Sequence, residues 1–315
     1  MARLDFEKPI VELEKKIQEL KHFISDKKID LSSEVKKLED KLEDLKKDTY
    51  TNLTPWQMVQ LARHPQRPYT LDYINILMTD FMELHGDRLF SDDKAIVSGL
   101  ARLDKQKVVV IGHQKGRDTK ENLKCNFGCA HPEGYRKTLR MMQLAEEFNL
   151  PVIIFIDTPG AYPGIGAEER GQSQAIATNL REMVSIATPI ISIVIGEGGS
   201  GGALGIGVAD RVYVLENSYY SVISPEGCAA ILWKDGSKAP EAAAALKLTG
   251  EDLLRLKVID AVIPEPLGGA HRNPEKTAQN IKEVLVKEIK ELKNFKKEDL
   301  LKARYNKFRG MGVVA

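Results

Sequence analysis

The fold of this chain is decided by the stretch Pro189-Ile-Ile-Ser-Ile-Val-Ile-Gly-Glu-Gly-Gly-Ser-Gly-Gly-Ala203. Its first half is a run of β-branched residues, which is typical of a buried β-strand. Glycines follow at positions 198, 199, 201 and 202, and the small residues of 203–210 predict a helix after them. Glycine lets backbone N–H groups approach a ligand because no Cβ intervenes, and a helix start adds unpaired donors and a positive dipole end. The stretch therefore predicts a site for negative charge: a phosphate, an acyl oxyanion or an enolate.

A second unit has the same pattern as this one. A helix predicted over 134–148 leads into the short apolar strand 151–156, which ends in Asp157-Thr-Pro-Gly-Ala161. In the same way, a long helix predicted over 168–188 leads into the glycine stretch. Repeated units of helix, short strand and glycine-containing loop indicate stacked turns of an α/β spiral. Ligands of layered α/β proteins gather at the carboxyl ends of strands, so both loops are candidate site segments.

Further α/β elements surround these two units. Residues 95–103 and 107–112 predict paired strands around a turn at Asp104-Lys105. Another strand is predicted at 211–215, and a helix followed by a strand within 250–264. These alternations extend the α/β class over most of the chain.

The N-terminal residues 7–48 predict a two-helix hairpin that is separate from the α/β region. The pattern breaks at 25–33, and residues 51–92 after the hairpin read as mixed and largely helical. The apolar stripe has spacings of three and four and consists of Ile10, Leu13, Ile17, Leu20 and Ile24, then Val35, Leu38, Leu42 and Leu45. The hairpin is either a brace on the main domain or an arm that docks a partner.

The C-terminal region predicts one covering helix and a tail. Residues 277–295 place Ile281, Leu285, Ile289 and Leu292 on one helical face, which favours packing on the core. Residues 296–315 read as a loose basic tail. The sequence thus divides into a hairpin at 1–50, a main domain at 51–295 and this tail.

Composition excludes several classes of protein. Lys and Arg number 46 against 45 Asp and Glu, so no strongly basic balance points to nucleic acid. The charged N-terminus is unlike a signal peptide, and no apolar run is long enough to span a membrane. Cys125, Cys129 and Cys228 complete no zinc pattern, which predicts no metal in this chain and reduced thiols in a cytoplasmic protein.

Two other motifs compete for the glycine stretch. Gly198-x-Ser200-x-Gly202 fits a nucleophile elbow, and Asp260 and His271 follow in the order that a hydrolase triad needs. Gly196-x-Gly198-x-x-Gly201 fits a dinucleotide fingerprint, but the span to the next strand is too short for a crossover helix. The chain has no P-loop and no biotinylation sequence Met-Lys-Met. The basic loop at 112–120 is either a phosphate-binding loop, through Lys115 and Arg117, or an ordinary solvated loop.

Seven longer motifs stand in order along the chain and together identify a family. They are Phe127-Gly128, Pro132-Glu-Gly-Tyr-Arg-Lys137, Asp157-Thr-Pro-Gly-Ala-Tyr-Pro-Gly164, Gly166-Ala-Glu-Glu-Arg-Gly-Gln172, Ile195-Gly-Glu-Gly-Gly-Ser-Gly-Gly-Ala-Leu204, Tyr220-Ser-Val-Ile-Ser-Pro-Glu-Gly-Cys228 and Ile263-Pro-Glu-Pro-Leu-Gly-Gly-Ala-His-Arg272. In these motifs the chain closely resembles the carboxyltransferase alpha subunits of bacterial acetyl-CoA carboxylase.

The resemblance implies a fold, a reaction and partners. The fold is a crotonase-like spiral of repeated ββα units with an N-terminal α-helical hairpin. The reaction transfers a carboxyl group from carboxybiotin, held on a biotin carboxyl carrier protein, to acetyl-CoA and gives malonyl-CoA for fatty acid synthesis. The partners are a beta subunit with a zinc ribbon, the carrier protein and a biotin carboxylase, in an alpha2beta2 assembly. A serine hydrolase with Ser200 as nucleophile is the alternative.

The chemistry of the reaction points to backbone groups as the site. In such a transfer the biotin nitrogen can take the acetyl proton, so the protein's task is to place N–H donors where negative charge develops. The predicted catalytic donors are Gly160, Ala161, Gly201, Gly202 and Ala203. The predicted substrate-binding residues are Gly198, Gly199, Ser200, Lys115 and Arg117.

Overall fold

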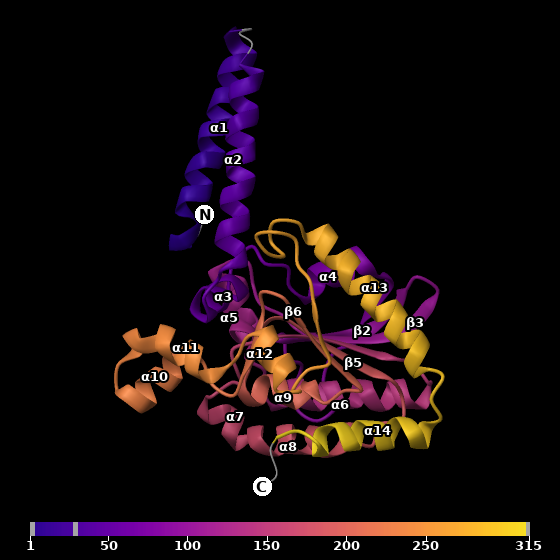
Figure 1. Ribbon diagram of the computed structural model, residues 1–315. Coiled ribbons are helices and arrows are strands. Elements are labelled where there is room, and N and C mark those ends of the chain that lie inside the picture. Colours follow the sequence, from indigo (N-terminus) through magenta and orange to yellow (C-terminus); the bar gives the residue numbers. More distant parts are fainter. Residues whose placement is uncertain (1–3, 28–30, 313–315) are drawn as a thin grey trace.

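A mixed β-sheet lies between layers of helices in the computed structural model of the chain, and a helical hairpin stands away from this body (Figure 1). The structure describes residues 4–27 and 31–312. The strands are β1 (Thr79–Glu83), β2 (Ile96–Leu103), β3 (Gln106–His113), β4 (Val152–Thr158), β5 (Ile190–Gly199), β6 (Arg211–Leu215), β7 (Tyr219–Ser221) and β8 (Ala261–Ile263). The helices are α1 (Lys8–Lys27), α2 (Ser32–Thr51), α3 (Pro55–Ala62), α4 (Thr70–Leu77), α5 (Thr119–Lys124), α6 (Pro132–Glu147), α7 (Ile165–Glu169), α8 (Gln172–Met183), α9 (Ser200–Gly207), α10 (Pro225–Trp233), α11 (Ala239–Leu246), α12 (Gly250–Arg255), α13 (Pro274–Leu292) and α14 (Lys297–Arg309), with short 3-10 turns at Asp5–Glu7, Asn126–Gly128 and Gly236–Lys238.

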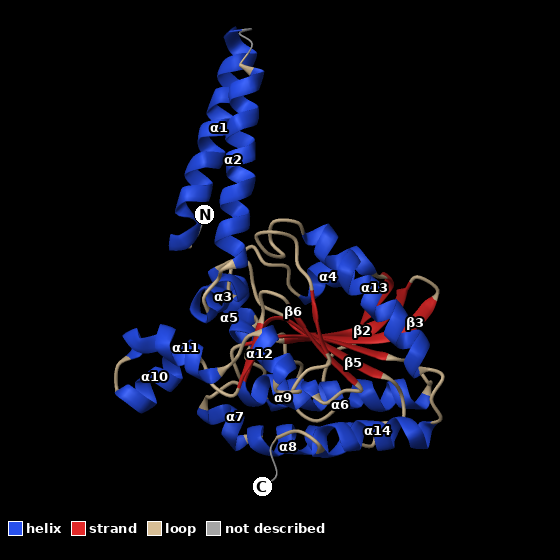
Figure 2. Cartoon of the chain, viewed as in Figure 1, coloured by secondary structure: helices blue, strands red, loops and turns tan. Residues whose placement is uncertain are grey.

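The sheet joins an antiparallel edge to a parallel centre. Its strands, drawn in red in Figure 2, have the order β1-β2-β3-β4-β5-β6-β8. Strand β7 pairs with the end of β5 beside this path. Strands β1 to β3 are antiparallel, and β3 to β8 along the path are parallel. The predicted β2–β3 pair and its turn are confirmed. The sequence analysis predicts no strand at β1, because Thr-Asp-Phe-Met-Glu has three polar residues and lies at an edge of the sheet where four of its five residues are exposed.

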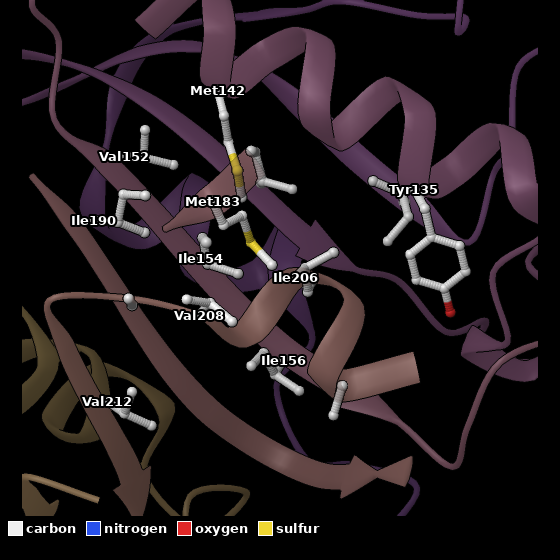
Figure 3. Packing of buried hydrophobic residues seen from close by; sticks show 14 of the residues in the cluster. Tyr135, Met142, Val152, Ile154, Ile156, Met183, Ile190, Ile206, Val208 and Val212 are labelled. Atoms are coloured by element: carbon white, nitrogen blue, oxygen red, sulfur yellow. The ribbon is translucent and has the colours of Figure 1, made fainter. Parts of the chain in front are cut away.

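The core lies on both faces of the central strands. On one face Val152, Ile154 and Ile156 of β4 pack against α6, α8 and α9 (Figure 3). On the other face Ile153 and Phe155 pack under α4 and α13. A strand that is buried on both faces reads as an unbroken apolar run, which is why the sequence shows it so clearly. Full burial of each such side chain stabilises the fold by about 1.5–3 kcal/mol.

The helix predicted over 168–188 is wrong as one element. The structure has two helices there, α7 and α8, and α8 ends at Met183. Gly171 separates them with a φ of 80°, a left-handed conformation that glycine adopts without strain. This break turns the chain after the loop at 159–164 and lets α8 pack on α6 and α9.

The loose basic tail predicted at 296–315 is also wrong, although residues 313–315 lie outside the described residues. Helix α14 forms at Lys297–Arg309, and its Arg304 is fully buried. The Arg304 guanidinium donates to both carboxylate oxygens of Asp210, at 2.8 and 2.7 Å, and to three backbone carbonyls. A basic segment predicts no fixed partner for its charges, whereas the charge of Arg304 holds α14 on the body. Helix α13 covers the core as predicted, with its four apolar residues buried.

The N-terminal hairpin is confirmed as α1 and α2, which pack on each other. The predicted break at 25–33 includes residues 28–30, which lie outside the described residues. Lys46 of α2 pairs with Glu14 of α1 at 2.7 Å. At the base, the Tyr50 hydroxyl of α2 donates to Glu7, in the 3-10 turn before α1, at 2.6 Å.

Candidate active site

Strand β5 runs through the first glycines before α9 begins. The sequence predicted that the strand ends at Ile195 and the helix starts at Ala203, and both boundaries are wrong. Strand β5 continues to Gly199 because β7 pairs with its last three residues. Strand β7 lies about twenty residues after these glycines, so the local β-propensity of the glycines does not reveal that they pair with it. Ser200 follows as an exposed turn residue with a φ of 48° and opens α9.

Helix α9 starts without a side-chain cap. Its N-cap residue is Gly199, which has no side chain to bond the first N–H groups. The first N–H groups of a helix have no intrahelical partner, so those of Gly201 and Gly202 can serve a ligand. Ala203 is the fourth helical residue, where the N–H of a regular α-helix donates to the N-cap carbonyl. Of the three predicted donors, Ala203 is therefore the least available.

The end of β4 offers a second backbone donor. The Thr158 hydroxyl donates to the Gly160 carbonyl at 2.8 Å and accepts from the Gly160 N–H at 3.1 Å. The Gly160 donor is thus already engaged. The Ala161 N–H meets no acceptor in the part of the chain that the structure describes. Ala161 is therefore the open donor of this predicted pair.

The structure brings the two predicted donor segments into direct contact. A Cβ on Gly202 would lie 2.5 Å from the Gly160 carbonyl carbon and 2.8 Å from the Ala161 nitrogen. A Cβ on Gly199 would lie 2.2 Å from the Pro159 oxygen. Backbone can come this close only where glycine removes the side chain. The start of α9 and the end of β4 therefore form one surface of backbone groups at the carboxyl edge of the sheet.

A buried network of charged side chains lies behind this surface. The Lys115 ammonium donates to Asp157 at 2.6 Å and to Glu197 at 2.7 Å. Glu197 also accepts from the Tyr219 hydroxyl and from Arg63, both at 2.7 Å. Lys115 is 13% exposed, and both of its carboxylate partners are buried further. The network joins the loop after β3 to β4, β5 and β7 at the point where β5 approaches its glycines.

Electrostatics keep the centre of this network ionised. Burial alone would raise the pKa of Glu197, but the charges of Lys115 and Arg63 outweigh it and hold that pKa at about 2. Burial alone would lower the pKa of Lys115, but Asp157 and Glu197 raise it well above its usual value. The positive charge of Lys115 is therefore balanced inside the protein. As a predicted substrate-binding residue, it faces carboxylates and not solvent.

Arg117, the other predicted substrate-binding cation, is also engaged within the chain. Its guanidinium stacks on the Tyr69 ring at 4.0 Å and pairs with Asp72. It donates further to the carbonyls of Pro65, at 3.0 Å, and Arg67, at 2.9 Å. These contacts fasten the loop after β3 to the segment between α3 and α4. The loop is thus held in one conformation beside the charge network.

His113, at the end of β3, is a buried group that the sequence did not single out. Neither ring nitrogen has a hydrogen-bond partner within residues 4–27 and 31–312. Burial, and then the charge of Lys115, lower the pKa of His113 to about 3, against a smaller opposing effect of the Gly202 backbone. The imidazole is therefore neutral and adds no charge beside the backbone donors.

Comparison with known proteins gives the family. The profile of the family described as "Acetyl co-enzyme A carboxylase carboxyltransferase-like" matches residues 3–312. The chain belongs to this family. The acetyl-CoA carboxylase carboxyl transferase subunit alpha of Thermus thermophilus is 58% identical over 312 residues, which cover 99% of each chain. That of Geobacter metallireducens is 60% identical over 313 residues, 99% of this chain and 98% of the relative. This alpha subunit is thus a member of a transferase family.

Solved structures confirm the crotonase-like fold predicted for the alpha subunit. Transcarboxylase 12S, solved with methylmalonyl-coenzyme A and methylmalonic acid, superposes with a TM-score of 0.54 at 20% identity over 70% of this chain. The matched part is 44% of that protein's chain, so the alpha subunit spans less than half of its length. A Pseudomonas malonate decarboxylase hetero-tetramer in complex with coenzyme A has a TM-score of 0.55 at 16% identity, over 67% of this chain and 84% of its own.

The hydrolase alternative lacks support in both the family and the geometry. Ser200 follows the carboxyl end of β5, whereas Asp260 lies at the amino end of the parallel strands, where its N–H donates to Val212 of β6. Asp260 accepts from the Val212 N–H at 2.6 Å and pairs with Lys307. His271 stacks on His64 at 3.9 Å beside the hairpin base. The three residues of the predicted triad therefore serve different parts of the fold.

Sequence reasoning missed Arg63, Arg67 and the role of Asp157. The two arginines lie in a region that read as mixed helix, where charged residues are expected on the surface. Asp157 was noted only as part of a motif. A usable signal was present for Asp157 alone, because a carboxylate at the end of a strand of apolar residues needs a buried partner. Nothing local marks the arginines, since their partners are distant in sequence.

The described residues contain neither a cluster that could bind a metal nor a helix that could span a membrane. Across 4–27 and 31–312, no three His, Cys, Asp or Glu side chains come together as a metal site. In the same residues, no helix is long and apolar enough to cross a membrane. All three cysteines are free thiols. Burial raises the pKa of Cys129 to about 11, so this thiol stays protonated at neutral pH.

Proposed function

We propose that this alpha subunit forms the biotin side of the carboxyltransferase site of acetyl-CoA carboxylase. In that site a carboxyl group passes from carboxybiotin to acetyl-CoA and gives malonyl-CoA, the first committed step of fatty acid synthesis. The observation that carries the proposal is the contact between the α9 start and Gly160–Ala161, which gathers backbone donors from two neighbouring strand ends. Fixed backbone donors stabilise negative charge that develops on an oxygen, which is what this transfer requires.

These residues fit the ring system of biotin, which is flat and neutral and carries a polar ureido oxygen. The N–H groups of Gly201, Gly202 and Ala161 supply donors on two sides. No atom lies within 4 Å of a Cβ placed on Gly160, so there is room beside these donors. When bound, carboxybiotin from a carrier protein supplies the carboxyl group.

In this proposal the residues have distinct tasks. Gly201 and Gly202 donate to the oxygen on which charge develops, and Ala161 donates from the neighbouring strand end, that of β4. Gly160 and Ala203 shape the surface, since their own N–H groups have partners within the fold. Among the predicted substrate-binding residues Gly198, Gly199 and Ser200, the exposed Ser200 is the one that faces the substrate, whereas Gly198 and Gly199 are buried in β5 and position the loop. Lys115 and Arg117 act on substrate binding only indirectly, because each is engaged with groups of this chain.

The same reading assigns partners. A beta subunit with a zinc ribbon completes the acyl-CoA side, a biotin carboxyl carrier protein delivers the carboxyl group, and a biotin carboxylase reloads it. The relatives' name, subunit alpha, supports a beta partner. We assign an alpha2beta2 assembly that works in the cytoplasm. The donor set described above serves one half of the reaction, which supports a site shared between two subunits.

The test is reconstitution. Decarboxylation of malonyl-CoA in the presence of biocytin is measured for the alpha subunit alone, for a beta subunit alone and for the mixture. We expect turnover only in the mixture, because the acyl-CoA half of the site belongs to the partner. Robust turnover by the alpha subunit alone would contradict the shared site. No turnover in a well-formed mixture would contradict the assigned reaction.

A further inference from the structure

Strand β5 contains a bulge immediately before its glycines. Along the β4–β5 pair, Ile156 lies opposite Val194, but Thr158 lies opposite Gly198. Two positions along β4 therefore match four positions along β5. Strand β5 carries two extra residues at this point, and bulges of this kind recur next to active sites.

The bulge decides where the glycines lie. In an unbroken register Gly196 would lie opposite Thr158, where Gly198 now lies. The bulge thus draws the glycines back by two residue positions, or roughly 7 Å at about 3.3 Å per residue. This shift brings Gly199 and Gly202 onto the backbone of 159–161. On its other side, β5 changes partner at the same point, from β6 to β7.

Charged side chains replace the ladder hydrogen bonds that the bulge disrupts. The Arg67 guanidinium donates to the Ile195 carbonyl at 2.6 Å. The Glu197 N–H donates to the Asp157 carboxylate at 2.9 Å. A buried backbone group without a partner costs about 1–3 kcal/mol, so these two contacts decide whether the bulge is stable.

Each of these side chains is neutralised by a buried partner. Arg67 pairs with Glu265 through two hydrogen bonds, and both side chains have almost no exposure. Asp157 accepts from Lys115, which also holds Glu197. Gly196 leaves room for this arrangement, because a Cβ there would lie 2.6 Å from the Asp157 carboxylate.

We propose that Arg67 and Lys115 are positioning residues: they hold the β5 bulge and thereby set the backbone donors of Gly201 and Gly202. Arg67 acts by binding the Ile195 carbonyl, and Lys115 acts by neutralising the two carboxylates that hold the other side of the bulge. The inference rests on the proposed function for the identity of the donors. It assigns Lys115 a task at a distance from substrate, in place of direct substrate binding.

The experiment compares Lys115→Met with Lys115→Met/Glu197→Gln in the reconstituted alpha–beta complex. Lys115→Met leaves Asp157 without its cation and Glu197 with Arg63 alone, so we expect kcat for malonyl-CoA decarboxylation to fall about 100-fold or more. KM for malonyl-CoA should change less than about threefold, since no substrate contact is lost. The double variant removes one carboxylate together with the cation and should regain at least about tenfold in kcat. Lys124→Met, at an exposed lysine of α5, is the matched control and should keep the wild-type kcat.

A second pair covers the case in which Lys115→Met does not fold. Asp157→Asn keeps an oxygen acceptor for the Glu197 N–H, whereas Asp157→Ala removes it. We expect kcat of the Ala variant to be at least about tenfold below that of the Asn variant. Hydrogen–deuterium exchange of the segment 196–203 should rise in the order wild type, Asn, Ala, because the bulge loosens.

The outcomes separate clearly. A rise in KM with unchanged kcat in Lys115→Met would show a substrate contact and overturn the proposal. A double variant as slow as Lys115→Met, or equal kcat and exchange in the two Asp157 variants, would also overturn it. The exchange measurement needs only the folded alpha subunit, so it still tests the bulge if the wild-type complex proves inactive. In that event the proposed function fails, and the exchange data alone decide whether these side chains hold the bulge.

Discussion

Replacing Gly202 by alanine tests the backbone-donor site most directly. A Cβ at this position would lie 2.5 Å from the Gly160 carbonyl carbon, 2.8 Å from the Ala161 nitrogen and 2.8 Å from the Gly160 oxygen. All three atoms are backbone, so no flexible side chain can move aside. Ordinary contact begins near 3.4 Å, so the two segments must separate by about 0.9 Å. The single methyl group therefore forces apart the two strand ends that carry the donors.

The expected magnitude follows from this displacement. A misplacement of about 1 Å in a catalytic arrangement can lower a rate about 100-fold, and loss of one backbone donor lowers it about 100- to 1,000-fold. We expect kcat of Gly202→Ala to fall by at least 100-fold. Overpacking of this kind destabilises a protein by about 1–3 kcal/mol, so the subunit should still fold.

The assay is malonyl-CoA decarboxylation by the reconstituted complex, with gel filtration and circular dichroism to confirm folding and assembly. Gly236→Ala is the matched control, because no atom lies within 4 Å of a Cβ placed there and its φ is not positive. Gly205→Ala is no neutral control, since its Cβ would press on the buried Tyr135 ring at 2.8 Å. A Gly202→Ala complex that assembles normally and turns over at the wild-type rate would refute the reasoning.

Three further predictions concern the hydroxyl, the C-terminal helix and pH. Ser200→Ala should keep most of its activity, and a fluorophosphonate should not label the wild-type subunit, because Ser200 is a turn residue and not a nucleophile. Arg304→Met should lower the free energy of unfolding by about 3–5 kcal/mol in urea, since it leaves Asp210 buried and unpaired, whereas Lys302→Met on the exposed face of α14 should not. The folded-state pKa of Glu197 is about 2 against a usual 4.5, so its contribution of roughly 3 kcal/mol is present above pH 4.5 and lost as pH falls toward 2. Wild type should therefore lose more stability than Glu197→Gln between pH 7 and pH 3, and equal losses would contradict the network described above.

Local pattern was enough to predict the elements that form the sheet and its cover. Strands β4 and β5 are apolar runs, and α6 and α13 have helical stripes, so each is visible in a window of ten to twenty residues. The pairing of two similar units also predicted that Gly160–Ala161 and Gly201–Gly202 lie together, because parallel strands bring their carboxyl ends to one edge. Topology brings the two segments to the same edge of the sheet, whereas their close contact also depends on the β5 bulge, which local pattern does not show.

Long-range contacts could not be predicted in the same way. Lys115 meets partners 42 and 82 residues away, and Arg67 meets the Ile195 carbonyl across 128 residues. The basic loop therefore read as solvated or phosphate-binding when its lysine is in fact balanced by buried carboxylates. Helix α14 was not predicted for the same reason, because its Arg304 pairs with Asp210, 94 residues away. A charge pattern shows how many charges a segment has and leaves their partners open.

Glycines can be required either to leave space for a ligand or to let protein atoms pack closely, and the sequence of the glycine stretch does not distinguish the two. As a sequence it predicted a loop that leaves space for a ligand. In the structure Gly196, Gly199 and Gly202 are required because protein atoms already occupy the space, namely the Asp157 carboxylate and the backbone of 159–161. Gly201 differs from them: a Cβ there would meet only the Ile176 side chain, at an ordinary 3.5 Å. A Cβ on Gly198 would likewise lie 2.8 Å from the Tyr220 ring. Packing therefore explains four of the five glycines in the stretch, and Gly201 is the one at which a side chain would fit without a clash at its Cβ.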